Sequence, residues 1–496
     1  MRILAVVLVL IVLAAAPGSA PPATFARLGD DAVATLRRAW YVPGGGWRGC
    51  AAPRCGASAS DWGADSLTGV LDERWLLTRD AALVPWVHAL LALAPDHLHD
   101  RGMLSDVPLW DAVSAVRAYD VTRDPGALQL AEDDYAYVAN EPSFTRGACA
   151  GIDYQYPQRD AGPRAGGGLK TLESDANRVL AAALLAARAG DPRARRAYLA
   201  DARYRYALIR ARFRDPRVGL YTVYAFDTGG ACTIVPRRFF ASVNGVMISA
   251  ALALADASGD PRYVREARAT ARAVRALDDD RGVFADLQAE NDVAAPLVFA
   301  MVELARRGDA FARAWILRNA AAAAHARRAD GSYARFFDGP PPGDGATVTA
   351  FQTAGGFALL VAAASFAPGD GPERDDPWPT AARREVDVRV PPSGAFAFVG
   401  SGIALVGTLG ERCIPAYRGD PMCEGGHAHV LLDGRAMTDR TGIWQGKTLT
   451  GAQPGTVLFA WRWPRAARHV LRFVGGEPNA KEGGPYLHLS GATTLP

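Results

Sequence analysis

One short turn motif recurs between the apolar, alanine-rich segments of this chain, and it constrains the fold more than any other feature. It occurs at residues 122–125 (Thr-Arg-Asp-Pro), 190–192 (Gly-Asp-Pro), 259–261 (Gly-Asp-Pro) and 308–309 (Gly-Asp). Glycine ends a helix because it accepts the left-handed conformation, aspartate caps the next helix, and proline fits a first turn that needs no amide donor. Repeats roughly 50 to 70 residues apart predict a series of antiparallel helical hairpins.

Apolar residues recur at helical spacing through about twelve stretches of the chain up to residue 366. These are 25–40, 67–77, 81–93, 107–120, 127–138, 172–189, 194–213, 240–257, 263–277, 294–307, 310–328 and 350–365. Some connections are tight Asp-Pro turns, whereas others are long and rich in glycine and aromatic residues, above all 140–170. Long loops in a compact domain are usually functional. We therefore expect residues 21–366 to form an all-α (α/α)6 toroid with a cleft at its long-loop end.

The composition changes after Phe366. A linker rich in Pro, Gly, Asp and Glu is expected at 367–384, and short alternating runs such as 386–390, 395–399 and 427–432 follow it. Asp433-Gly434 is typical of a hairpin turn. Such runs predict an all-β sandwich over residues 385–496, so the chain is expected to be multi-domain.

The N-terminal segment has the pattern of an export signal. Met1-Arg2 precedes an apolar run over 3–16 and then Gly18-Ser19-Ala20, so residues 1–20 are predicted to be a signal peptide. The run is short for a membrane span, but Pro21 disfavours cleavage, which leaves an uncleaved N-terminal anchor as the alternative. In both cases we expect a protein that is secreted or held in the cell envelope.

The charge and the cysteine content indicate which ligands and which disulfides to expect. The chain has 55 Lys and Arg against 52 Asp and Glu, a net charge of +3, so nothing indicates nucleic-acid binding. We expect a monomer.

No Cys-x-x-Cys motif or His-rich cluster occurs, so neither a metal nor a cofactor is expected. Export would make the six cysteines disulfides, with two pairs close in sequence and one long-range pair: Cys50 with Cys55, Cys413 with Cys423, and Cys149 with Cys232.

Several short motifs, in order along the chain, carry a resemblance to a known family. The stretch 104–120 begins Leu-Ser-Asp-Val-Pro-Leu-Trp-Asp and ends Arg-Ala-Tyr-Asp, and Trp62 precedes it. A glycine-rich loop into a helix follows at 166–177, then Ser-Val-Asn-Gly-Val-Met at 242–247, Leu-Arg-Asn-Ala at 317–320 and Gln-Thr-Ala at 352–354. Together these resemble glycoside hydrolase family 76, the endo-α-1,6-mannanases, which have an (α/α)6 toroid.

The resemblance implies a catalytic site at the start of the stretch 104–120. In the family, two adjacent aspartates begin an inner helix and act as nucleophile and acid/base, as in retaining glycosidases whose carboxyl groups lie about 5 Å apart. The second of these positions is Asp106 here, which would be the acid/base. The first is Ser105, a poor nucleophile at an anomeric carbon.

Ser105 leaves three interpretations open. Another carboxylate could act with Asp106, either Asp175 or Asp153 by preference, with Asp111 and Glu173 as further candidates. Alternatively, a carboxylate about 6.5–9.5 Å from the acid could hold a water molecule, and the reaction would then invert the configuration at the anomeric carbon. Alternatively, the site binds glycan and no longer cuts it. From the residues alone, Ser105-Asp106 is also an ordinary helix start with a capping serine and an acidic first turn.

Aromatic and amide side chains complete the expected site. Aromatic faces suit the C–H side of a pyranose ring, and an amide on an otherwise apolar helix needs a polar partner, which a sugar hydroxyl would provide. The expected substrate-binding residues are Trp62, Ser105, Trp110, Tyr154, Asn177, Asn244 and Gln352. Packing in the core is the alternative for each aromatic residue. The run Asp278-Asp279-Asp280 is expected to be a surface turn.

The β region resembles galactose-binding-like modules through 398–400 (Phe-Val-Gly), 430–434 (Val-Leu-Leu-Asp-Gly), 468–471 (Arg-His-Val-Leu) and 482–484 (Glu-Gly-Gly). The two resemblances imply a secreted glycoside hydrolase that acts on an α-linked, α-1,6-mannan-like polysaccharide or oligosaccharide. Two alternatives remain: a non-catalytic glycan-binding protein with a degenerate site, and a cell-wall transglycosidase.

Overall fold

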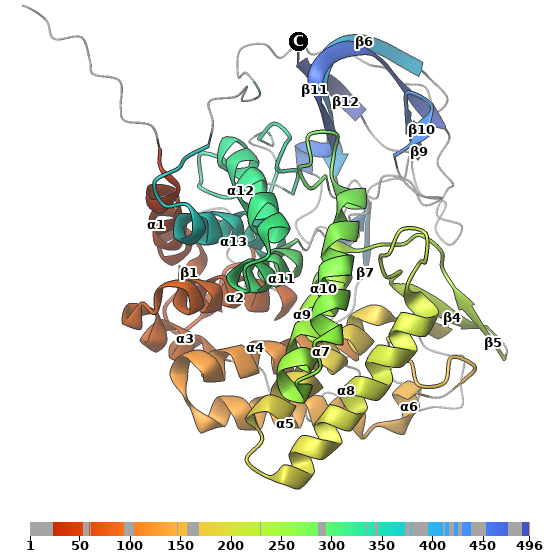
Figure 1. Ribbon diagram of the computed structural model, residues 1–496. Helices are drawn as coiled ribbons and strands as arrows, with labels where there is room; N and C mark the ends of the chain where they lie inside the picture. The colour runs from red at the N-terminus through yellow and green to blue at the C-terminus, as the bar shows by residue number, and fades with distance from the viewer. Residues whose placement is uncertain are drawn as a thin grey trace, which may run out of the picture.

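The computed structural model describes residues 23–52, 59, 61–93, 104–145, 147–155, 168–228, 230–285, 294–333, 335–341, 343, 346–372, 378, 395–409, 412–415, 421–424, 429–437, 453–474 and 489–495. Helices dominate up to Phe366, and strands dominate from Ala395 onward (Figure 1). The predicted signal peptide and most of the predicted linker lie outside the described residues.

Six helices form a closed inner layer in which each helix packs mainly against its two neighbours. In order around the ring they are α2 (Asp61–Thr78), α4 (Asp106–Thr122), α7 (Leu172–Arg188), α9 (Ala241–Ser258), α11 (Ala295–Arg306) and α13 (Ala350–Phe366), which returns to α2. An outer layer packs against them: α1 (Phe25–Thr35), α3 (Val84–Leu91), α5 (Pro125–Ala139), α8 (Pro192–Phe213), α10 (Arg262–Ala273) and α12 (Ala310–His325). The predicted (α/α)6 toroid is confirmed.

The recurrent turn motif builds the hairpins as predicted. The carboxylates of Asp124, Asp191 and Asp309 each accept a hydrogen bond from a backbone N–H in the first turn of the helix that follows. Gly259 ends α9 in the left-handed conformation, with φ of 71°. Because these turns are short, every inner helix ends at the same end of the ring. The long connections therefore gather at the opposite end, where the inner helices begin.

Helix α9 shows how tightly the inner layer packs. A Cβ atom at Gly245 would lie only 2.4 Å from the backbone nitrogen of Leu297, so only glycine allows α9 and α11 to approach this closely. Within the described part of the chain, α9 is also the one helix that is long and apolar enough to cross a membrane. The interior of the protein buries 83% of it, as is typical of a core helix.

Short strands and a disulfide organise the long-loop end. Strands β3 (Leu169–Thr171), β4 (Tyr224–Thr228) and β5 (Ala231–Ile234) form one small sheet, and β1 (Tyr41–Val42) pairs with β2 (Gly46–Trp47). The short helix α6 (Pro142–Thr145) precedes a segment, 147–155, that we call the clamp loop. The predicted disulfide between Cys149 and Cys232 is confirmed, and it ties the clamp loop to β5. Cys50 is also disulfide-bonded, whereas Cys55 lies outside the described residues.

The C-terminal region is all-β, as predicted. One antiparallel sheet has the order β10 (Arg435–Ala436), β9 (His429–Leu432), β11 (Gln453–Val474), β6 (Ala395–Leu409) and β12 (Leu489–Leu495). Asp433 and Gly434 turn from β9 to β10 with φ of 52° and 79°, as the hairpin signal indicated. A separate hairpin of β7 (Arg412–Pro415) and β8 (Pro421–Glu424) places Cys413 opposite Cys423.

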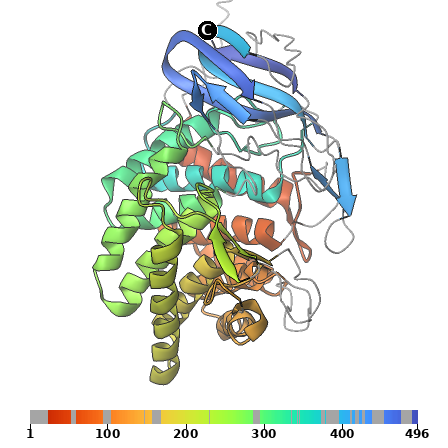
Figure 2. The ribbon, with the colours of Figure 1, turned by 90° about the vertical axis from the view of Figure 1, so that its right-hand side faces the viewer.

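The sheet packs directly against the helical ring (Figure 2). The indole Nε1 of Trp461 donates to Asp280 at 3.1 Å, and Arg462 donates to Asp338 at 3.1 Å. Asp278 and Asp279 are only 8% and 7% exposed. The expectation of a surface turn at 278–280 was therefore wrong for Asp278, which accepts a hydrogen bond from Trp315 of α12, and for Asp279, which lies against Asp338. Asp280, the residue that strand β11 contacts, remains exposed.

Candidate active site

The candidate residues collect where the inner helices begin. Trp62, Asp106, Asp175, Asn244 and Gln352 each lie in the first turn of a different inner helix, and Asn177 lies one turn further along α7. The N-terminus of a helix has unsatisfied backbone N–H groups and a partial positive charge, so it favours acidic and hydrogen-bond-accepting groups. The end of the ring that carries the long loops is therefore the end suited to bind an oxygen-rich ligand.

Asp106 is the first residue of α4 and is 2% exposed. Burial raises the pKa of its carboxyl group to about 7, against the effect of hydrogen bonds from the backbone N–H groups of Asp106 and Val107. One carboxyl oxygen, Oδ1, has no hydrogen-bond partner among the described residues. A carboxyl group that keeps its proton near neutral pH is suited to general acid catalysis.

Asp106 lies on the side of α4 that faces the axis of the ring. Trp110, Val113 and Arg117 follow it at helical intervals of four, seven and eleven residues, and all three line a cavity of about 30 Å³ between the inner helices. Other walls of this axial cavity come from α2, α7, α9 and α11, through Asp65, Asp72, Leu180, Ser249 and Phe299 among others. The cavity is large enough for one or two water molecules.

The floor of the axial cavity is charged, which the sequence did not reveal. Arg117 pairs with Glu303 at 3.4 Å. Asp72 is 1% exposed, and its carboxyl oxygens have no hydrogen-bond partner among the described residues. Burial raises the pKa of Asp72 well above its usual value, although the nearby Arg117 lowers it. No group of three or more His, Cys, Asp or Glu side chains in the described part of the chain is arranged to hold a metal ion.

Ser105 is fully buried and its hydroxyl group is committed to neighbouring segments. It donates to the backbone carbonyl of Tyr154 at 2.7 Å and lies 2.5 Å from the hydroxyl of Ser174. An aspartate at this position would put a second acceptor against the Tyr154 carbonyl, so the local structure suits a hydroxyl group. This geometry gives Ser105 a role in holding α4 against α7 and the clamp loop.

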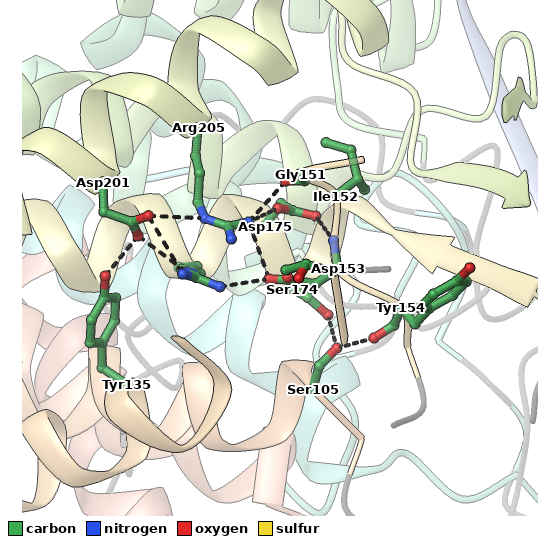
Figure 3. A network of polar contacts seen from close by, with 12 residues as sticks. Ser105, Tyr135, Gly151, Ile152, Asp153, Tyr154, Ser174, Asp175, Asp201 and Arg205 are labelled. Carbon is green, nitrogen blue, oxygen red and sulfur yellow. Dashed lines mark hydrogen bonds and ion pairs between the residues drawn. The ribbon is translucent and has the colours of Figure 1, made fainter. Parts of the chain in front are cut away.

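Asp153 and Asp175 lie together, fully buried, in an ion-pair network between α7, α8 and the clamp loop (Figure 3). Arg205 of α8 pairs with Asp175 at 2.6 Å and with Asp153 at 3.3 Å, and Arg178 pairs with Asp153 at 3.4 Å. Asp201 pairs with both arginines. The expectation that Asp153 or Asp175 is the second catalytic carboxylate is not supported by this arrangement, because arginines from the outer side of α7 hold both groups.

The three aromatic candidates differ in their surroundings. Tyr154 is 1% exposed, its hydroxyl donates to Asp227, and Lys170 lies 3.9 Å from its ring centre, so it packs in the interior of the clamp loop. Trp110 is half-buried on the wall of the axial cavity. Trp62 is half-buried in the first turn of α2. The two tryptophans are therefore better placed than Tyr154 to meet a sugar ring.

The three amide candidates all bond to the backbone. Asn244 accepts from the N–H of Tyr221 and donates to the carbonyls of Tyr221 and Phe240. Asn177 donates to the carbonyl of Glu173. Gln352 accepts from the N–H of Thr349 in a capping box. These contacts provide partners that the sequence analysis had expected from a sugar, except for Oδ1 of Asn177, which has no hydrogen-bond partner among the described residues.

We predict that Asn244→Leu lowers stability and leaves carbohydrate affinity unchanged. The variant would leave the N–H and carbonyl of Tyr221 buried without partners, at about 1–3 kcal/mol for each group. Asn319 on the outer helix α12 accepts from Phe284 and donates to Trp315 in the same way, so Asn319→Leu is a matched control. Chemical denaturation should show a loss of stability for both variants, smaller for Asn319→Leu because that variant frees only the N–H of Phe284. A clear loss of ligand affinity in Asn244→Leu alone would instead assign Asn244 to the binding site.

We also predict that the protein becomes less stable as the pH rises from about 5 to about 8. Burial raises the pKa of Glu73, Asp106, Asp175 and Asp278 to about 7 and that of Asp279 to about 8. Between the unfolded pKa near 4 and these folded values, the folded state binds more protons than the unfolded state, so the free energy of unfolding falls with pH. Urea midpoints measured across this pH range test the direction of the change in stability. A midpoint that increases towards pH 8 would contradict the prediction.

Comparison with solved structures identifies the fold. An α-1,6-mannanase of glycoside hydrolase family 76 from Salegentibacter sp. HEL1_6, in an inactive variant with bound α-1,6-mannotriose, matches 69% of this chain and 99% of its own at 18% identity and a TM-score of 0.59. A family 76 α-mannanase of Bacteroides thetaiotaomicron matches 68% of this chain and 95% of its own, with 14% identity and a TM-score of 0.53. A protein from Listeria innocua matches 70% of this chain and 99% of its own, with 15% identity and a TM-score of 0.56.

No protein-family model matches the sequence, and no curated protein matches it. The likeness is therefore one of structure, and it covers nearly the whole length of each of these solved chains. The helical part of this protein has the fold of the family 76 α-1,6-mannanases, as the sequence resemblance implied.

Proposed function

We propose that this protein, which shares its fold with the family 76 α-1,6-mannanases, is a glycoside hydrolase that cleaves α-linked, α-1,6-mannan-like polysaccharide. Asp106 acts as the acid/base. The observation that carries the proposal is the state of this carboxyl group, which is buried at an inner-helix start with a pKa of about 7 and with Oδ1 unpartnered among the described residues. Such a group can protonate a glycosidic oxygen at neutral pH.

The reaction needs a second carboxylate, and we assign it to Glu173. Glu173 lies in the first turn of α7, seven residues before Leu180, so it shares the helix face that lines the axial cavity. Asp175 lies about 200° further around the helix and faces Arg205 instead. The contact between Ser105 and Ser174 brings the first turns of α4 and α7 together, next to Asp106 and Glu173.

The substrate assignment rests on the solved structures of this fold. The Salegentibacter enzyme is an α-1,6-mannanase with bound mannotriose. The tryptophans Trp62 and Trp110 would stack on sugar rings at the same end of the ring. Export of the chain through its N-terminal segment would give the enzyme access to an extracellular or cell-wall polysaccharide.

Incubation of the full chain with a panel of polysaccharides tests the proposal. We expect reducing ends to be released from α-1,6-mannan and not from β-1,4-mannan or α-1,4-glucan. Glu173→Gln should abolish this release, whereas Asp111→Asn, one turn away from Asp106 on α4, should retain it. Products longer than the starting oligosaccharide would indicate the transglycosidase alternative. Absence of any cleavage of α-mannosides would refute the hydrolase proposal.

One observation favours a second function, that of a glycan-binding protein. Ser105 occupies the first position of the pair that is acidic in the family, and its hydroxyl group is bound to Tyr154 and Ser174. A protein with this function would bind α-1,6-mannooligosaccharides in calorimetry and release no product from them.

A further inference from the structure

The ion-pair network of Figure 3 continues to the start of α4, and this continuity has a mechanistic consequence. Arg205 on α8 holds the carboxylate of Asp175 at 2.6 Å. The other oxygen of that carboxylate accepts a hydrogen bond from the backbone N–H of Asp153 at 2.9 Å. One residue later, the carbonyl of Tyr154 accepts from the hydroxyl of Ser105 at 2.7 Å. The contacts therefore run without a break from an outer helix to the residue before Asp106.

The clamp loop is fixed to α4 by its backbone as well. The N–H of Ser105 donates to the carbonyl of Gln155 at 2.9 Å, so residues 154 and 155 both bond to Ser105. Ser105 has no side-chain capping bond of its own to α4, since its hydroxyl group is directed to Tyr154 and Ser174. The position of the first residue of α4 thus depends on the position of residues 153–155.

Burial makes the network sensitive to the loss of any one member. Asp153 and Asp175 are fully buried, and Arg178 and Arg205 are 5% and 4% exposed. With Asp201 the network has three acidic and two basic side chains. Burial and the neighbouring Asp153 raise the pKa of Asp175 to about 7, whereas Arg205 and Arg178 lower it. Removal of an arginine would leave buried carboxylates without a counter-charge, which displaces the segment that they hold.

We propose that Arg205 and Asp175 are positioning residues for Asp106: they fix residues 153–155 of the clamp loop, which in turn fix Ser105 and the start of α4. Neither residue touches the substrate. This inference rests on the proposed function for its catalytic consequence, because displacement of an acid by about 1 Å reduces the rate by up to about 100-fold. Its structural content, the coupling between α8 and the start of α4, stands independently of any activity.

A second ion pair between the same inner helices provides a matched control. Arg188 near the end of α7 pairs with Asp120 near the end of α4, at the short-turn end of the ring. Arg188→Met therefore weakens the contact between α4 and α7 as Arg205→Met weakens the network, but far from Asp106. Asp175→Asn and Arg205→Lys are gentler variants for the case that Arg205→Met does not fold.

The test compares these variants in the full chain by hydrogen exchange and by kinetics. We expect Arg205→Met, or its gentler substitutes, to increase amide exchange in residues 104–107 and 153–155, and Arg188→Met to leave these segments protected. In hydrolysis of α-1,6-mannotetraose, kcat should fall about 10- to 100-fold with KM changed less than about threefold, and Arg205→Lys should recover part of the loss.

Exchange that increases only in α8 and in residues 147–152, with 104–107 unchanged, would overturn the inference. So would an equal fall of kcat in Arg188→Met. If the wild-type chain cleaves no α-mannoside, the proposed function fails, and hydrogen exchange alone then decides whether the network positions the start of α4.

Discussion

Asp106→Asn is expected to abolish hydrolysis of α-1,6-mannooligosaccharides while leaving their binding intact. General acid catalysis contributes about 10²- to 10⁴-fold to a rate, and an amide cannot transfer the proton that a carboxyl group with a pKa of about 7 provides. The substitution keeps the shape of the buried side chain and adds no charge, so the fold should not change. Initial rates and titration calorimetry on the same preparation measure the two effects separately.

The control for this prediction is Asp111→Asn. Asp111 is also buried on α4, at 7% exposure, but it lines a separate side cavity next to α3 with residues such as Trp47 and Leu90. We expect the kcat of Asp111→Asn to stay within about threefold of the wild-type value, because Asp111 is not on the face of α4 that carries Asp106. Equal losses in the two variants would remove the special role of Asp106, and a loss of binding in Asp106→Asn alone would make it a binding residue.

Removal of the disulfide between Cys149 and Cys232 is expected to have the largest effect on stability. The bond closes a loop with a sequence separation of 83 residues. Loop-closure entropy for this length corresponds to about 4–5 kcal/mol, and measured losses are usually about 2–4 kcal/mol. The double variant Cys149→Ala/Cys232→Ala should therefore lose about 3 kcal/mol in urea denaturation. It should also loosen the clamp loop, so catalytic activity should fall together with stability.

The single variant Cys149→Ala separates the effect of losing the disulfide bond from the effect of replacing both side chains. It also breaks the bond, so we expect most of the loss seen in the double variant. If the wild-type protein and the double variant unfold at the same urea concentration, the disulfide bond does not contribute to the stability of the folded state.

The helical architecture could be predicted because its signals are local. Each turn motif contains both the residue that ends one helix and the residue that caps the next, and Asp124, Asp191 and Asp309 all cap as expected. Long-range docking has no such local signal. The run at 278–280 looks like an exposed turn, but Trp315 of α12 donates to Asp278 and buries it.

The orientation of the candidate site residues could not be predicted from the sequence, and α7 shows why. Every residue from Leu172 to Ala183 is buried, so α7 has no exposed face that would reveal its orientation. Glu173 and Asp175 are two residues apart and point in different directions, and the sequence alone could not tell which one faces the axis of the ring. The partners that decide it, Arg178 and Arg205, come from the helix itself and from α8.

Asn244 was assigned to substrate binding for a similar reason. Its position on an apolar helix correctly indicated that the amide needs a partner. The partner is the backbone of Tyr221, 23 residues earlier, in a connection whose path follows from tertiary packing. A sequence pattern identifies the unsatisfied group but not the segment that satisfies it.

The pH dependence of kcat/KM for α-1,6-mannotetraose tests the central claim most directly, because it reports the ionisation of the free enzyme. If Asp106 is the proton donor, the rate should decline on the alkaline side with an apparent pKa near 7, the value that burial gives this carboxyl group. A rate that stays constant from pH 5 to pH 9, or a chain that binds the tetrasaccharide and never cleaves it, would contradict the account.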